Sequence, residues 1–516
     1  MMVFGGIMET ALPETEKSAG TDWTVKSIPK SFTAKPKRGE WDGVDGKKLQ
    51  PCYSWKKFNE ALPPLKEIGC IEPRHSRDVR ENGWSVPCTC LDRDYADFTV
   101  YEKYVGEIGV KHAQLQSGWA KTEQHKGVYN FEWLDVSVNG LVRQGVKPWV
   151  CICYGNPLYG SDFKLGMKIR QILCDEEARA AWHRYVAALI TRYKDRVFDW
   201  EIWNEPFRQG RDYGILIAET AKTIRKIQPE AHLIVSGMRY PTDYRECCEY
   251  LKSENALDCV DEFMYHPYAL NPDACELGLE GVPGAATEYA PTGTKVRELL
   301  HAYNPRWLVT MGESGCAAQL EYAHAMPGYP WTEFSQVKWD TRHALLCAGL
   351  GFRYNMFAMI DMQYPYMLQS FGLLRSTTLL EVVYKRPKYY AYQHICALFD
   401  DTVKNLGLIE NECEIFGWAD ANERGKQRKV TSVGFKTEKG DNILAAWYGD
   451  RIPSDGTGWD RVNLTVKGIA FKDPVFVDIV TGRIFELKRN SVFSSDGVTT
   501  FWDLPLRDSP IVIKER

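Results

Sequence analysis

The sequence lacks three features that would assign it quickly to a class: a long apolar run, an excess of one charge, and a spaced cysteine framework. No stretch reaches the roughly 20 apolar residues that cross a membrane, and residues 1–8 are too short and too weakly apolar for a secretory signal. Lys and Arg number 64 against 68 Asp and Glu, which gives a net charge of −4 and a pI near 6.3. This balance gives no indication of a nucleic-acid partner. We therefore expect a soluble protein that binds neither membranes nor nucleic acid.

The cysteines do not follow the pattern of a disulfide-rich secreted protein. Their number, 15, is odd, and several form close pairs. The pairs are Cys88/Cys90, Cys151/Cys153 and Cys247/Cys248. We expect reduced, mostly buried thiols, which favours a cytoplasmic protein, with export after removal of a signal as the alternative. C-x-C pairs without further ligands at zinc spacing are a weak metal signal, so no metal site is predicted.

The length of 516 residues favours an α/β barrel with a smaller second domain. Residues 1–55 are polar and charged, and we expect an extended segment that packs on the second domain or adds strands to it. Residues 56–398 alternate between strand and helix patterns, as in a (β/α)8 TIM barrel. From 399 to 516 short alternating runs predict an antiparallel β-sandwich. The eight expected barrel strands lie at 68–74, 110–115, 146–153, 198–205, 232–236, 259–266, 306–313 and 352–361.

Two of these expected strands end in a glutamate. Trp203-Asn204-Glu205-Pro206 closes the fourth strand, and Pro206 lacks the N–H that a sheet needs, so the strand should stop at Glu205. The apolar run before Glu313 ends in the same way at the seventh strand. Both carboxyl groups would project from the face where the loops of a barrel build active sites. Two carboxyl groups that flank one bond are what glycoside hydrolysis requires.

An Asn-Glu-Pro strand end followed by a later strand-end Glu resembles the retaining glycoside hydrolases of clan A, most similarly the family 39-like and family 5-like enzymes. The resemblance implies that Glu205 is the acid/base and Glu313 the nucleophile, without a metal or organic cofactor. Asn204 is placed to bind the sugar 2-hydroxyl. The run Met311-Gly312-Glu313-Ser314-Gly315 departs from the usual nucleophile setting of family 39, so xylosidase or iduronidase activity is not implied.

Other residues at strand ends are candidates for the same site. His266 and Tyr268 resemble the His-x-Tyr placement of the clan, and the Tyr268 hydroxyl would hold Glu313 ionised. Their alternative role is packing at a turn. Arg74, after the first expected strand, would donate to Glu313 or else be a surface arginine. Three further residues follow expected strands and would line a sugar pocket: Trp119, Asn156 and Gln363.

These patterns predict a retaining hydrolase of β-linked glycosides from plant or microbial polysaccharides or oligosaccharides. The alternatives are a non-catalytic carbohydrate-binding barrel and a transglycosylase on the same scaffold. The expected partner is an oligosaccharide or polysaccharide. No residue pattern identifies the sugar, the linkage, exo or endo action, or the oligomeric state.

Overall fold

The computed structural model describes residues 49–160, 169–278, 291–319, 326, 329–426 and 428–516. Most of the expected extended segment, 1–55, lies outside these residues. Within them, α2 (Tyr53–Glu60) is a helix where extended chain was expected up to residue 55. Its Lys57 and Phe58 carbonyls accept the terminal Ala61 N–H, and Phe58 buries its ring.

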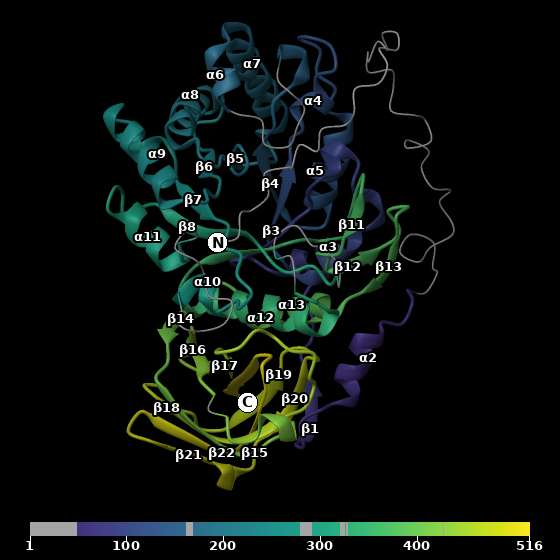
Figure 1. Ribbon diagram of the computed structural model, residues 1–516, viewed down its shortest axis with the longest axis vertical. Coiled ribbons are helices and arrows are strands. Elements are labelled where there is room, and N and C mark those ends of the chain that lie inside the picture. Colours follow the sequence, from purple (N-terminus) through teal and green to yellow (C-terminus); the bar gives the residue numbers. More distant parts are fainter. Residues whose placement is uncertain (1–48, 161–168, 279–290, 320–325, 327–328, 427) are drawn as a thin grey trace, which may run out of the picture. The chain divides into compact units, whose positions relative to one another are not determined.

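Eight parallel strands close into a barrel, which confirms the expected fold class (Figure 1). β9 pairs with β2 through Trp84 opposite Tyr354, and this pairing closes the ring. The strands are β2 (Trp84–Pro87), β3 (His112–Gln116), β4 (Lys147–Ile152), β5 (Asp199–Ile202), β6 (His232–Val235), β7 (Glu262–Tyr265), β8 (Leu308–Ser314) and β9 (Arg353–Met356).

Helices follow the barrel strands and cover their outer faces. Local sequence sets several of their starts: Asp175 accepts the Ala178 N–H at the start of α7, and Thr332 forms a capping box with Ser335 at α12. The helices are α3 (Glu102–Ile108), α4 (Trp119–Thr122), α5 (Glu132–Arg143), α6 (Ile169–Cys174), α7 (Glu176–Tyr193), α8 (Gly210–Ile227), α9 (Pro241–Ser253), α10 (Ala274–Leu277), α11 (Gly293–His301), α12 (Glu333–Gly349) and α13 (Pro387–Leu398).

The predicted first barrel strand, at residues 68–74, is wrong. β1 (Lys66–Cys70) instead pairs antiparallel with β20 (Arg483–Glu486) in a C-terminal sheet. The first barrel strand is β2, whose four residues are all buried. β2 is short and ends in a proline, so its sequence gives little indication of a strand. The sequence of β1 does look like a strand, but its partner β20 lies more than 400 residues further along the chain.

The C-terminal region forms two antiparallel sheets, as expected. One contains seven strands in the order β1-β20-β19-β23-β17-β16-β14, and the other four in the order β15-β18-β22-β21. Apolar side chains from both sheets, such as Leu444 and Leu464, share one buried cluster. The strands not yet located are β14 (Val403–Leu408), β15 (Asn411–Gly417), β16 (Val430–Thr437), β17 (Asn442–Tyr448), β18 (Asp460–Lys467), β19 (Pro474–Asp478), β21 (Val492–Ser495), β22 (Val498–Leu506) and β23 (Ile511–Glu515). Two small hairpins precede α13: β10 (Met362–Tyr364) with β11 (Met367–Gln369), and β12 (Leu374–Ser376) with β13 (Val382–Lys385).

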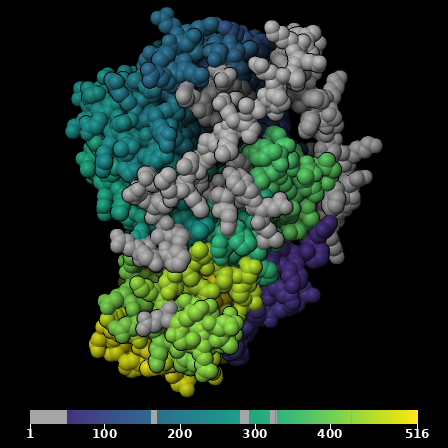
Figure 2. Space-filling view, in the orientation of Figure 1, coloured from purple at the N-terminus to yellow at the C-terminus, as the bar shows by residue number. Residues whose placement is uncertain are grey.

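Barrel and sandwich are joined by a buried ion pair and by buried hydrogen bonds. α12 and α13 lie between the two (Figure 1), and in the space-filling view the purple segment of α2 and β1 lies against the yellow C-terminal surface (Figure 2). Lys338 of α12 bonds to Asp508 at 2.6 Å, and both side chains are almost fully buried. Arg342, one turn further, donates to the Arg451 carbonyl of the sandwich at 2.9 Å. Its barrel partner Asp273 accepts from Trp447 Nε1 of the sandwich, also at 2.9 Å. A buried charge is costly without its partner, so these contacts tie the two parts together.

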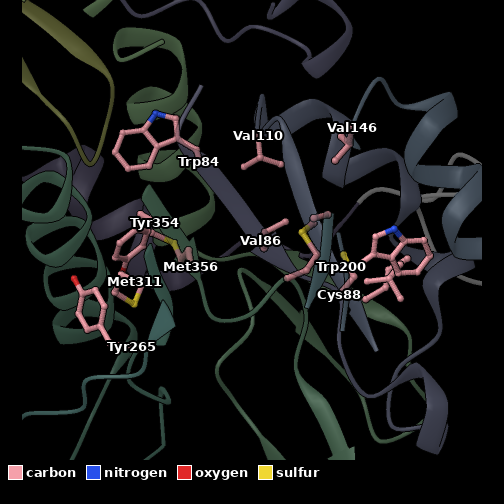
Figure 3. Close-up of a cluster of buried hydrophobic side chains, with 14 of the residues drawn as sticks. Trp84, Val86, Cys88, Val110, Val146, Trp200, Tyr265, Met311, Tyr354 and Met356 are labelled. Carbon is pink, nitrogen blue, oxygen red and sulfur yellow. The ribbon is translucent and has the colours of Figure 1, made fainter. Parts of the chain in front are cut away.

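The barrel strands divide their side chains by alternation. Residues that face outward are apolar and pack under the helices; in Figure 3, Tyr354 and Met356 of β9 lie near Met311 of β8. Residues that face inward are largely polar, for example Gln114, Glu201 and Asn355, all fully or almost fully buried. A polar barrel interior therefore lies next to the strand ends that carry the candidate acids.

The cysteines are all unpaired, and most are buried, as expected. Among the described residues, no helix combines the length and apolar character needed to cross a bilayer.

Candidate active site

The ends of β5 and β8 position Glu205 and Glu313. β5 ends at Ile202, three residues earlier than predicted, and the chain then leaves the sheet with Trp203 at φ 67° and Glu205 at φ 49°. Left-handed conformations are unfavourable for such residues, and strain of this kind concentrates at functional sites. The Glu205 N–H donates to Ser236 Oγ at 3.2 Å. Glu313 lies in β8 where the register with β9 shifts, an irregularity that re-aims side chains.

The two acids meet as predicted. One oxygen of Glu205, one oxygen of Glu313 and one ring nitrogen of His266 all lie within 4.8 Å of one another. The Glu205 side chain is 29% exposed, whereas that of His266 is 2% exposed. Glu205 is therefore accessible to a ligand, whereas the side of the site that His266 occupies is closed to solvent.

His266 and Tyr268 each contact one acid. His266 Nδ1 lies 2.9 Å from Glu205 Oε1, and the Tyr268 hydroxyl donates to Glu313 Oε1 at 2.7 Å. Burial raises the pKa of Glu313 to about 7, and the charge of Glu205 adds to the rise. The charges of His266 and Arg93 and the hydrogen bond from Tyr268 lower this pKa. The contact predicted for Tyr268 is present.

Asn204 belongs to a polar wall that the sequence did not reveal. Its Nδ2 donates to the Tyr154 hydroxyl at 2.8 Å, and the Arg93 guanidinium lies 5.5 Å from the Tyr154 ring centroid. Arg93 also donates to Gln116. The sequence offered one signal for this wall. Gln116 and Tyr154 come directly after the expected strands 110–115 and 146–153, where a barrel builds its active site.

The predicted role of Arg74 is wrong. Its guanidinium donates to Asp400 at 2.6 Å and to the Asp78 carbonyl at 3.1 Å, not to Glu313. The error has the same origin as the misplaced first strand. Arg93, in the loop after the true first strand β2, is the arginine whose charge lowers the pKa of Glu313.

Trp119 and Asn156 both contact Glu123. Trp119 is fully buried and donates to Glu123 Oε2 at 2.5 Å, and Asn156 Nδ2 donates to the Glu123 carbonyl at 2.8 Å. Their contact with a sugar stays a prediction. Gln363 lies in β10 and donates to the Tyr364 carbonyl at 2.7 Å, so its contact with a sugar stays a prediction.

Glu201, four residues before Glu205, is a buried carboxyl group that the sequence reasoning missed. Gln114 Nε2 donates to its Oε2 at 2.6 Å. Burial raises the pKa of Glu201 to about 7, against the hydrogen bond from Gln114 and the charge of His266. The alternation of side chains along β5 could have revealed Glu201. It places the acidic residues Asp199 and Glu201 on the same face of the strand, which points into the barrel.

Among the described residues, two clusters each bring together three side chains of types that can bind a metal ion. The first is the group Glu205, His266 and Glu313 itself. The second is Glu276, His343 and Cys347, where Glu276 Oε1 lies 2.8 Å from His343 Nε2 and accepts from the thiol at 3.4 Å. Tyr265 also donates to this oxygen, at 2.9 Å. The second cluster is therefore a buried hydrogen-bond network around one carboxyl group.

No protein-family model and no curated protein matches the sequence. Solved structures do match. A family 39 glycoside hydrolase from Bacteroides cellulosilyticus WH2 superposes with a TM-score of 0.57 at 17% identity, over 84% of this chain and 81% of that chain. The family 39 enzyme from Xanthomonas axonopodis pv. citri gives 0.51 at 14% identity, over 86% and 95%. The catalytic domain of family 30 xylanase C from Talaromyces cellulolyticus gives 0.51 at 13% identity, over 86% and 98%. At these identities the similarity shows the fold, which agrees with the resemblance to clan A.

Proposed function

We propose that the protein is a retaining glycoside hydrolase that cleaves β-linked glycosides of plant or microbial polysaccharides or oligosaccharides by double displacement. The observation that carries the proposal is the approach of Glu205 and Glu313 oxygens to within 4.8 Å. Retaining enzymes hold their carboxyl groups about 5 to 5.5 Å apart, whereas inverting enzymes keep about 6.5 to 9.5 Å to admit a water molecule. The pair fits the shorter class.

In the first step Glu313 attacks the anomeric carbon and Glu205 gives its proton to the departing oxygen. Two carboxyl groups this close do not readily carry two charges, and burial and the charge of Glu205 raise the pKa of Glu313. The charges of His266 and Arg93 and the hydrogen bond from Tyr268 oppose this rise and favour the carboxylate form of Glu313. The first step needs this form of the nucleophile.

In the second step Glu205 takes a proton from water, and that water attacks the glycosyl ester on Glu313. Formation of the ester removes the charge of Glu313, and Glu205, which has given up its proton, is left to act as the base. The same residue then serves as acid and as base. Asn204, held by Tyr154, is positioned to bind the sugar 2-hydroxyl, a contact that strengthens in the transition state.

The proposed catalytic unit is the barrel within residues 56–398, and the accessory unit is the sandwich of residues 399–516, which β1 joins. One structural neighbour, at 13% identity, is named a xylanase, and this motivates polysaccharides as the proposed substrate class.

Covalent trapping tests the function. The protein is incubated with a panel of 2-deoxy-2-fluoro glycosides, digested and mapped by mass spectrometry. We expect one sugar to add to the peptide that carries Glu313, and Glu313→Ala to abolish both labelling and hydrolysis of aryl glycosides. Wild-type hydrolysis that persists in Glu313→Ala would overturn the assignment. Sugar binding without labelling or turnover would indicate a binding protein, and transfer products without hydrolysis would indicate a transglycosylase.

A further inference from the structure

A connected polar cluster fills the barrel interior next to the catalytic pair. Gln114 of β3 reaches Glu201 of β5 across the intervening strand β4, and Asn355 of β9 reaches Gln114 across β2 at 3.4 Å. Asn355 Nδ2 also donates to the Gly312 carbonyl at 2.8 Å, one residue before Glu313. Hydrogen bonds that skip a neighbouring strand must cross the inside of a barrel, so these side chains share one interior layer.

His266 extends into the same layer. Added Cβ atoms at Gly237 and Gly312 would lie 2.4 Å from its Cδ2 and 2.9 Å from its Nε2, so both glycines make room for the ring. His266 Nδ1 faces Glu205, and Nε2 points away from it, toward Gly312. Gly312 therefore lies between His266 and the chain of hydrogen bonds that begins at Glu201.

Several buried polar atoms of the barrel strands and of His266 have no hydrogen-bond partner within the described part of the chain. They include Trp149 Nε1, Glu201 Oε1, His266 Nε2 and Asn355 Oδ1. Buried polar groups are nearly always paired, and a buried water molecule bonds to about three such groups. The set contains a donor, two acceptors and a ring nitrogen that is either, which is the combination that water satisfies.

We propose that Glu201 is a positioning residue of the active site, which acts through ordered water in this layer on His266 and thereby on the proton held between His266 and Glu205. The proposal rests on the proposed function, in which Glu205 is the acid/base. It assigns no step of bond making to Glu201. Its carboxylate stabilises an added proton on His266, and its neutral form does not.

The charges around each group define the direction of the effect. Glu201 faces Gln114 from β3, Cys151 from β4, Ser236 from β6 and His266 beyond β7. Of these, only His266 is cationic when protonated. His266 in turn faces three carboxyl groups, those of Glu205, Glu313 and Glu201. Removing the charge of Glu201 must weaken proton binding by His266, whereas no cation near Glu201 is left unpaired.

Burial raises the pKa of Glu201 to about 7, so its charge changes within the working range of pH. This supports the proposal, because a group that titrates near neutrality alters the charge on its neighbour there. It also explains why an amide should be tolerated. Glutamine keeps the shape and an acceptor for Gln114, and it removes a buried charge.

The test is the pH profile of Glu201→Gln. We expect the basic limb of kcat/KM to move to lower pH by about 0.5 to 1.5 units, with KM at the optimum little changed. Asp199→Asn is the matched control, because Asp199 lies two residues earlier on the same face of β5 but pairs with His112 at the far end. The control should leave the limb in place. An unshifted limb in Glu201→Gln, or an equal shift in both variants, would overturn the proposal.

A second readout needs no substrate. The imidazole of His266 is titrated by NMR in histidine-labelled protein and identified by its loss in His266→Asn. Its midpoint should fall in Glu201→Gln, and an unchanged midpoint would refute the proposal. If the wild type hydrolyses no glycoside but the midpoint shifts, the proposed function fails and the link between Glu201 and His266 stands. If Glu201→Gln does not fold, Gln114→Leu, which removes the donor that favours the Glu201 carboxylate, should lower the same midpoint by a smaller amount.

Discussion

The hydrogen bond from Tyr268 to Glu313 should control the acidic limit of activity. Tyr268→Phe removes one oxygen that donates to Glu313 Oε1 at 2.7 Å and leaves the ring in place. Because the bond favours the carboxylate form, it lowers the pKa of Glu313, against the rise that burial and the charge of Glu205 produce. Its removal must raise that pKa further.

The size of the effect follows from the strength of the bond. A hydrogen bond to a charged, buried group contributes about 1.5 to 3 kcal/mol, and about 1.4 kcal/mol corresponds to one pKa unit. The acidic limb of kcat/KM should therefore move to higher pH by about 1 to 2 units. Below that limb Tyr268→Phe should be about 10- to 100-fold slower than the wild type, and toward alkaline pH the difference should shrink.

The assay is hydrolysis of an activated aryl glycoside from about pH 4 to pH 9, a range that brackets the expected shift. Tyr265→Phe is the matched control, because Tyr265 is also buried and donates to a carboxyl group, Glu276 Oε1 at 2.9 Å, outside the site. It should lower stability and leave the limb unmoved. A uniform loss of rate in Tyr268→Phe without a shift of the acidic limb would refute the reasoning, since it would show that the hydroxyl does not govern ionisation of Glu313.

Three further changes test other parts of the structure. Glu205→Ala should be labelled by an activated fluoroglycoside but release the sugar much more slowly than the wild type, because no base remains for the second step. Mass spectrometry over time measures the release, and equal lifetimes of the labelled enzyme in both proteins would contradict the role of Glu205 as the base. Arg93→Met should move the acidic limb in the same direction as Tyr268→Phe, because the positive charge of Arg93 lowers the pKa of Glu313; an unchanged limb would show that this charge is not felt there. Asp508→Asn should cost about 3 to 5 kcal/mol in thermal or urea unfolding, because it leaves the buried Lys338 unpaired. The partner charge holds the pKa of Asp508 well below its usual range, so in the wild type this stability is complete above the ordinary aspartate pKa and is lost as the pH falls through the folded value; unfolding curves that are equally steep in pH for both proteins would contradict this.

The sequence carried enough information to predict the acids and the fold, and the reasons are local. Glu205 stands next to Pro206 and Glu313 ends an apolar run, so the approximate place of each at a strand end follows from its own neighbours, although β5 ends at Ile202. The alternation of strand and helix patterns then gives the barrel. These signals require no knowledge of distant parts of the chain.

The errors came where the partner is distant or the backbone is unusual. β1 looks like a barrel strand, but its partner is β20, and only folding brings them together. Arg93 lies in a short turn between Cys90 at φ 64° and Asp94 at φ 59°, conformations that side-chain patterns do not reveal. Arg74 was chosen in its place because it followed the wrong strand.

Two fully buried glutamates inside the barrel show how neighbours decide the role of a carboxyl group. Burial raises the pKa of Glu262, but the charge of Arg353 and the hydrogen bond with His232 outweigh it and bring the pKa to about 2. Burial also raises the pKa of Glu201, and Gln114, the more distant His266, Ser236 and Cys151 oppose the rise without outweighing it, so its pKa is about 7. Glu262 is thus a permanent charge that pairs strands at one end of the barrel, whereas Glu201 changes its charge near neutrality beside the site. The pKa values of these two buried carboxyl groups thus shift in opposite directions. A carboxyl group that stays charged at neutral pH does not alter the pH profile of activity, whereas one that titrates near neutrality does, so we expect Glu201 rather than Glu262 to move the profile.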